Sequence, residues 1–269
     1  MTDAGASLDA RDGISRNVLL AEGLEKRFGG VAAVDNVSLV VRSNEIVGLI
    51  GPNGAGKTTL FDLLAGEQKP SAGRILVNDV AVEHAPAHAR IGCGLGRTFQ
   101  IPRPFAGMTL VENVMLGGRG QSGEQPWPNW LTPGRVAREE RANFEKAMAL
   151  LDFVTLAPLA QQPARVLSGG QRKLLELARI MMAEPKILLL DEPAAGVNPA
   201  LLEVIIERIA AINRQGAAFL IIEHNMEMVA RLCSHVFVMA SGRMLCEGRP
   251  GEVAEDPRVI EAYLGGGAT

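Results

Sequence analysis

One stretch of the sequence has the residue types and spacing to bind phosphate, and we call it the phosphate loop. It fits the pattern G-x-x-x-x-G-K-[ST]. Glycines let backbone N–H groups crowd around a phosphate, and a helix that begins there adds positive potential. We expect Lys57 to neutralise β- and γ-phosphates and Thr58 to hold Mg²⁺, the alternative being a plain glycine-rich turn. The loop comprises Gly51, Pro52, Asn53, Gly54, Ala55, Gly56, Lys57, Thr58 and Thr59.

Two acids and a histidine follow apolar segments further along the chain. Asp191 and Glu192 follow the run 187–190, and His224 comes shortly after the run 218–222. Because parallel strands present their carboxyl ends at one sheet edge, we expect these side chains near the phosphate loop. Asp191 is then a Mg²⁺ ligand, directly or through water, and Glu192 a general base for water attacking the γ-phosphate. His224 would sense that phosphate; acids that merely start a loop and a structural histidine are the alternatives.

A second candidate anion site has the order Ser168, Gly169, Gly170, Gln171. Ser and Gln at this spacing form a helix capping box, which by itself explains those two residues. It does not explain the two glycines, whose N–H groups at a helix start are open to an anion. The chain therefore has two candidate phosphate-contacting surfaces. Gln100, by its residue type alone, is a surface glutamine.

Hydrophobic patterning predicts the elements that position these residues. A β-rich first part surrounds one helix, and later helices alternate with buried strands, so the class is α/β. Residues 117–135, rich in Gly and Pro, predict a loop that holds Trp127 and Trp130. The expected strands are 37–41, 45–50, 74–77, 187–190 and 218–222, with a hairpin of 236–240 and 243–247. The expected helices are 57–65, capped by Gly66, then 136–153, 171–183 and 201–212.

Composition excludes several classes of protein. The 269 residues carry 27 basic and 30 acidic side chains, which disfavours general nucleic-acid binding. No apolar run approaches the roughly 20 residues that span a bilayer. The three cysteines have no metal-ligand spacing and suit a reducing cytoplasm. Residues 1–17 contain no secretory signal and are expected to form a flexible tail.

Together these motifs resemble the nucleotide-binding subunit of ABC transporters, over nearly the whole chain from residue 18. The resemblance implies one P-loop NTPase domain at 18–264, with a β-rich N-terminal lobe, a parallel-sheet core and a short flexible tail at 265–269. A helical subdomain is expected at residues 105–170. ATP and Mg²⁺ are the implied cofactors. The implied assembly is a head-to-tail dimer, homo- or heteromeric, that closes over two ATP molecules.

The same resemblance implies roles for individual residues. Phe28, in Arg27-Phe-Gly-Gly, corresponds to the aromatic residue that stacks on adenine. Gln100 corresponds to the residue that touches Mg²⁺ and the membrane subunit. Glu192 is the implied catalytic base and His224 the switch histidine. The γ-phosphate held by the other protomer is contacted by Ser168, Gly169, Gly170 and Gln171.

Three stretches, 97–105, 191–199 and 256–264, look like branched-chain amino acid importers. That branch implies integral membrane permease subunits, an indirect solute-binding protein and a peripheral place on the cytoplasmic face of the inner or plasma membrane. Two residues depart from the commoner ABC pattern, which has Asp at both positions. Asn198 is common in this branch, and Asn225 follows the switch histidine. Neither removes a catalytic group, so activity is expected.

Other functions compete with this reading. The same role could serve urea, short amides or other amino acids. A soluble ABC ATPase acting on nucleic acid or ribosomes is disfavoured by the single cassette, the absence of a heptad run and the acidic balance. A non-hydrolysing ATP switch is disfavoured by Glu192. The two tryptophans at 127 and 130 either pack on a membrane subunit or cover their own domain.

Overall fold

The computed structural model describes residues 16–98, 104–119 and 133–264. One sheet contains β1 (Asn17–Phe28), β2 (Val31–Arg42), β4 (Ala72–Val77) and β5 (Val80–Ala81). The other contains β3 (Ile46–Ile50), β6 (Leu95–Arg97), β7 (Ile187–Asp191), β8 (Ala218–Ile222), β9 (His235–Ala240) and β10 (Arg243–Gly248). The helices are α1 (Lys57–Ala65), α2 (Ala87–Gly92), α3 (Leu110–Met115), α5 (Pro133–Phe153), α6 (Gly169–Met181), α7 (Pro199–Arg214), α8 (Met226–Leu232), α9 (Pro250–Glu255) and α10 (Pro257–Leu264). Short 3₁₀ turns lie at Ala157–Leu159 and Ala164–Val166.

The two sheets differ in strand direction. The smaller has the order β2-β1-β4-β5 and is antiparallel throughout. The larger has the order β10-β9-β3-β8-β7-β6, and all its pairs are parallel except β9 with β10. Parallel pairing brings the ends of β3, β7 and β8 to one edge, where the phosphate loop, Glu192 and His224 follow.

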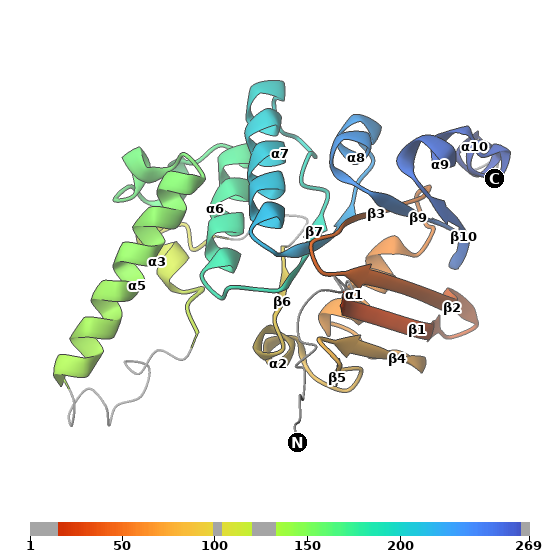
Figure 1. The fold of residues 1–269 in the computed structure, drawn as a ribbon, viewed down its shortest axis with the longest axis horizontal. Helices are drawn as coiled ribbons and strands as arrows, with labels where there is room; N and C mark the ends of the chain where they lie inside the picture. Colours follow the sequence, from red (N-terminus) through yellow and green to blue (C-terminus); the bar gives the residue numbers. More distant parts are fainter. Residues whose placement is uncertain (1–15, 99–103, 120–132, 265–269) are drawn as a thin grey trace, which may run out of the picture.

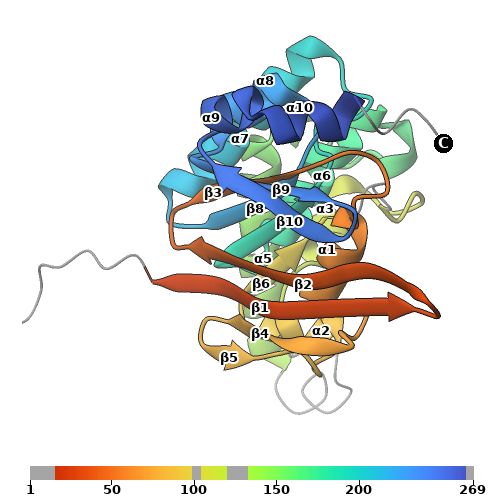
Figure 2. The same ribbon diagram turned by 90° about the vertical axis from the view of Figure 1, so that its right-hand side faces the viewer.

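Helix α1 lies between the two sheets, as Figure 2 shows. Its apolar side chains share one core with both sheets, including Leu60 and Phe61 of α1. The opposite face of the larger sheet packs against helices α6, α7 and α8 in a second core. Strand β7 alternates accordingly: Ile187 and Leu189 face the first core, Leu188 and Leu190 the second. A strand buried on both faces is continuously apolar, as in a covered parallel sheet.

Helices α3 and α5 form an arm at the end of the molecule opposite the smaller sheet (Figure 1). They pack on each other and on α6, which connects the arm to the larger sheet. Helix α3 begins with a capping box in which Thr109 and Glu112 bond each other's backbone N–H. None of the helices in the described ranges combines the length and the apolar character needed to cross a membrane.

The α/β class, the β-rich lobe and the parallel core are confirmed. Helix α1 occupies the predicted residues and ends at Gly66, which has φ 84°. Several boundaries were wrong. The charged helix begins at Pro133, inside the predicted loop, because proline fits the first helical turn where its missing N–H is not needed. Helix α6 begins at Gly169 directly after its serine cap and ends two residues earlier than predicted.

Some predictions lie outside the described residues. These are Gln100, both tryptophans and most of the two predicted tails. Of the predicted N-terminal tail the structure describes only Arg16 and Asn17, the latter being the first residue of β1.

Candidate active site

The phosphate loop joins β3 to α1, and its shape depends on two glycines. Gly51 has φ 149°, and a Cβ there would stand 2.1 Å from the carbonyl oxygen of Met239 in β9. Gly56 has φ 96°, and its Cβ would stand 2.3 Å from the carbonyl oxygen of Ala33 in β2. The loop is therefore wedged against backbone on both sides, which only glycine allows.

The start of α1 is open to an anion. Gly56 is the N-cap residue and has no side chain to occupy the first N–H groups, and no acidic residue stands in the first turn. Uncapped N–H groups and the helix dipole together favour a phosphate at this position. This is the arrangement that the glycine and lysine spacing predicts.

Lys57 is held close to the loop that precedes it. Its side chain is buried, and Nζ donates hydrogen bonds to the carbonyl oxygens of Gly51 at 2.7 Å and Pro52 at 3.0 Å. Burial lowers the pKa of the ammonium, while the carboxylates of Glu192 and Asp191 oppose that shift. Lys57 thus stabilises the loop through hydrogen bonds, and its positive charge would attract a phosphate.

A pocket of about 590 Å³, here called the loop pocket, brings several predicted residues together. Lys57, Thr58, Glu192 and His224 all line it. The remaining lining residues are Val31, Ala32, Ala33, Asn53, Gly54, Ala55, Gly56, Thr59, Ile222, Ser241 and Gly242. Phe28, Asp191 and the Ser168–Gln171 segment are not among them.

Glu192 and His224 both line the loop pocket, and their side chains are in contact. Nε2 of His224 lies 3.3 Å from Oε1 of Glu192. Glu192 also has a left-handed backbone with φ 47°, and its N–H donates to the carbonyl oxygen of Ile222 at 2.9 Å. That conformation costs a non-glycine residue on the order of 1 kcal/mol, and such strain clusters at functional sites. The chain turns sharply here and keeps a carboxylate beside a histidine.

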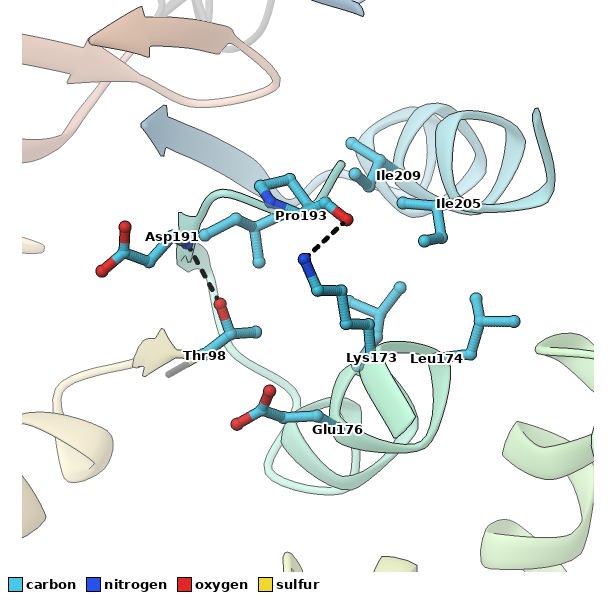
Figure 3. A pocket seen from close by; sticks show the side chains of 10 residues that line it. Thr98, Lys173, Leu174, Glu176, Asp191, Pro193, Ile205 and Ile209 are labelled. Atoms are coloured by element: carbon cyan, nitrogen blue, oxygen red, sulfur yellow. Dashed lines mark hydrogen bonds between the residues drawn. The ribbon is translucent and has the colours of Figure 1, made fainter. Parts of the chain in front are cut away.

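Asp191 is the last residue of β7 and lies deeper than its neighbour. It is 5% exposed, and burial raises the pKa of its carboxyl group, with Arg97 acting in the opposite direction. Its backbone N–H donates to Oγ1 of Thr98 at 3.2 Å (Figure 3). A desolvated carboxylate gains stability from a nearby cation, so the residue suits Mg²⁺.

The donor set also suits Mg²⁺, which binds through one or two carboxylates together with phosphate oxygens and water. Asp191 and Thr58 supply oxygen ligands of that kind. Within the described ranges, no three His, Cys, Asp or Glu side chains gather into a metal cluster. The residues therefore fit a magnesium ion shared with a nucleotide.

Glu223 is a structural residue of the site that the sequence reasoning missed. Its carboxylate is 3% exposed and accepts three backbone N–H bonds. Oε1 accepts from Ala194 at 2.6 Å, and Oε2 accepts from His224 at 2.9 Å and Asn225 at 3.0 Å. It ties the loop after β7 to the loop after β8. An acid directly after a buried strand was the available signal.

Lys173 was also missed. Its Nζ donates to the carbonyl oxygen of Glu192 at 2.5 Å. It also donates to the carbonyl oxygen of Pro193 at 3.2 Å, as Figure 3 shows. Burial lowers the pKa of the ammonium, with Glu223 foremost among the carboxylates that raise it. Lys173 therefore connects helix α6 directly to the backbone of Glu192. A lysine beside the apolar Leu174 was the only sequence signal.

The Ser168–Gln171 segment forms the predicted capping box, which is confirmed. Gln171 N–H donates to Oγ of Ser168 at 3.3 Å, and Ser168 N–H donates to Oε1 of Gln171 at 3.0 Å. The two glycines differ in their surroundings. A Cβ on Gly169 would meet nothing within 4 Å, whereas one on Gly170 would stand 2.3 Å from the Leu201 side chain of α7. Gly170 thus allows α6 to approach α7, while Gly169 stays exposed.

Phe28 ends β1 and is 49% exposed. It pairs with Val31, which lines the loop pocket, and Nζ of Lys26 lies 5.2 Å from its ring centroid. The aromatic ring is therefore close in the sheet to the pocket without lining it.

The two asparagines that depart from the common pattern both cap helices: Asn198 accepts from Leu201 N–H and Asn225 from Met228 N–H. Asparagine caps as well as aspartate does.

Comparison with known proteins gives two family matches. Residues 34–195 match the model described as ABC transporter. Residues 243–269 match the model described as branched-chain amino acid ATP-binding cassette transporter.

Curated relatives agree with these matches. The chain is 39% identical over 253 residues to the high-affinity branched-chain amino acid transport ATP-binding protein LivG of Escherichia coli K12, covering 94% of this chain and 99% of the relative. It is 38% identical over 248 residues to a probable LivG of Archaeoglobus fulgidus, covering 92% and 95%.

Solved structures agree as well. A nucleotide-free ATP-binding cassette from an ABC transporter is similar with a TM-score of 0.80 and 35% identity, over 92% of this chain and 98% of the other. The ADP conformation of MJ1267, an ATP-binding cassette of an ABC transporter, is similar with a TM-score of 0.81 and 36% identity, over 93% and 100%.

Proposed function

The chain belongs to the family of ABC transporter ATP-binding proteins, and on that premise we propose that it is the ATP-hydrolysing subunit of a branched-chain amino acid importer. One observation carries the site assignment: the loop pocket joins the phosphate loop to Glu192 and His224. The proposed substrate is based on the relatives, whose names specify branched-chain amino acids.

The predicted site residues in and near the loop pocket each have a proposed task. The N–H groups at the start of α1 and the ammonium of Lys57 bind the phosphates. Glu192 accepts a proton from a water molecule as its oxygen attacks the γ-phosphorus and ADP leaves. His224, at 3.3 Å from Glu192, orients that carboxylate and contacts the γ-phosphate. Phe28 stacks on the adenine.

Mg²⁺ would be held by Thr58 and Asp191, with Gln100 as the third proposed ligand. When bound, the ion neutralises charge on the β- and γ-phosphate oxygens. Burial of Asp191 supports this assignment, because a cation offsets the desolvation of its carboxylate.

A second copy, or a homologous subunit, would complete the site. Ser168 and Gly169 are exposed, and the loop pocket of the same chain does not include them. We propose that this surface contacts the γ-phosphate held by a partner in a head-to-tail dimer. The exposed Asn198 region, at the start of α7, would lie near the same interface.

A groove of about 840 Å³ is the proposed contact with a permease subunit, and we call it the α3 groove. Ile91, Phe105 and Leu116 line it and are 42%, 55% and 51% exposed. Arg97 and Phe105 both line it, and Gln100 lies between them in the sequence. The exposed apolar side chains of this groove suit contact with a segment of a membrane-embedded partner. Such a contact would attach this chain peripherally to the membrane, and the permease would link it indirectly to a solute-binding protein.

The direct test is transport by the reconstituted complex in proteoliposomes. We expect ATP-driven uptake of leucine in the presence of the matching solute-binding protein. Leu116→Asp should abolish uptake while ATP binding persists, because a charge would disrupt the α3 groove. Val80→Asp, which places a charge at a 50% exposed position on β5, is the matched control and should transport normally. ATP-driven uptake of urea or a short amide without leucine would refute the substrate assignment.

A further inference from the structure

The C-terminal helix α10 reaches the phosphate loop through one side chain. Oη of Tyr263 accepts a hydrogen bond from the N–H of Gly51 at 2.9 Å, across 212 positions of sequence. Helix α10 packs on α9 and β10 at the edge of the larger sheet, as Figure 1 shows. Tyr263 is the only tyrosine of the chain.

Gly51 directly follows β3, which ends at Ile50, and it is the first residue of the phosphate loop. It is buried and is packed so tightly on the backbone of Met239 that no side chain fits. Its N–H is bonded by Tyr263, and its carbonyl oxygen accepts from Nζ of Lys57 at 2.7 Å. The N–H and the carbonyl oxygen of Gly51 are thus both bonded by side chains, one 212 positions away and one 6 positions away in the sequence.

A bound phosphate should affect the Lys57 bond to Gly51 but not the Tyr263 bond to Gly51. The ammonium of Lys57 is the proposed phosphate ligand, so its bonds to the carbonyls of Gly51 and Pro52 compete with that role. Tyr263 has no such competing task. Burial raises the pKa of its phenol, which therefore stays neutral.

We propose that Tyr263 is a positioning residue of the nucleotide site, which holds Gly51 and hence the phosphate loop in the shape that binds ATP. This inference rests on the nucleotide site proposed above. It gives the C-terminal segment a task in ATP binding, although no residue of α10 lines the loop pocket. Glu192 and His224 follow other strands, so the chemical step should not depend on Tyr263.

The test is steady-state ATPase kinetics of Tyr263→Phe, which keeps the ring and its packing but removes the acceptor. We expect KM for ATP to rise about fivefold with kcat little changed, as the loss of one hydrogen bond to a buried N–H implies. Leu264→Ala, at a 79% exposed neighbouring position of α10, is the control and should leave both constants unchanged.

Three outcomes separate the possibilities. A raised KM with unchanged kcat supports the positioning role. An unchanged KM in Tyr263→Phe, with a lowered melting temperature in Tyr263→Ala, would show that the ring only anchors α10 and would overturn the inference. If the wild-type chain fails to bind ATP in an equilibrium assay, the proposed nucleotide site itself is wrong, and the inference fails with it.

Discussion

Glu192 is supported by residues that do not line the loop pocket. Its backbone is left-handed and would relax without support. Lys173 donates a hydrogen bond to the carbonyl oxygen of Glu192. The carboxylate of Glu223 accepts hydrogen bonds from the N–H of Ala194, two residues after Glu192, and from the N–H of His224. These contacts hold the carboxylate and the imidazole at the observed separation. The geometry of this proposed catalytic pair is therefore set by the buried Glu223 and the half-buried Lys173.

Lys173→Met tests that support. The methionine keeps most of the side-chain volume but loses the ammonium that bonds Glu192 and Pro193. We expect kcat for ATP hydrolysis to fall about tenfold, which corresponds to a charge-assisted hydrogen bond of about 1.5 kcal/mol. ATP affinity, measured by titration, should stay unchanged because Lys173 does not line the loop pocket.

The control for this variant is Lys186→Met, which removes an exposed lysine just before β7. It should hydrolyse ATP at the wild-type rate. If Lys173→Met also keeps the wild-type kcat, the lysine has no part in positioning Glu192.

At the scale of elements, the two ends of α1 differ. Its N-terminus has no side-chain cap, while its C-terminus is capped by Gly66 and by Arg90 of α2. Nη1 of Arg90 donates to the carbonyl oxygens of Leu63 at 2.6 Å and Leu64 at 2.7 Å, and the side chain is fully buried. A buried cation at a helix C-terminus satisfies the carbonyls that the helix cannot.

Arg90→Met should therefore destabilise the fold rather than change the chemistry directly. The carbonyl oxygens of Leu63 and Leu64 would lose their charged donor, which is expected to lower the free energy of unfolding by about 2–4 kcal/mol. Urea unfolding followed by circular dichroism measures this. Arg138→Met, on the exposed face of α5, should change it by less than about 0.5 kcal/mol. Equal stabilities of the two variants would contradict the capping role.

The elements that the sequence predicted best were those with local causes. Helix α1, strand β8 and the hairpin of β9 and β10 follow from apolar runs between turn residues, which act over a few positions. The contacts of Tyr263 with Gly51 and of Lys173 with Glu192 join distant segments. No local pattern encodes such contacts, because they depend on how the sheets and helices pack. For the same reason, the sequence did not predict that Gly170 allows α6 to approach α7.

At the scale of the whole molecule, one chain carries two candidate phosphate-contacting surfaces that do not share a pocket. The loop pocket contains the phosphate loop, Glu192 and His224, whereas the exposed Ser168 and Gly169 lie outside it. A partner that presents its own Ser168 surface would close over the pocket. ATP should therefore join two copies, or two homologous subunits, and hydrolysis should separate them.

Glu192→Gln tests the central claim most directly, because the amide keeps the shape of the carboxylate but cannot accept the proton from water. The measurement is ATP binding, ATP turnover and molecular mass by light scattering on the same sample. The account predicts tight ATP binding, turnover reduced by at least about a hundredfold and accumulation of an ATP-bound dimer. Turnover at the wild-type rate would contradict it.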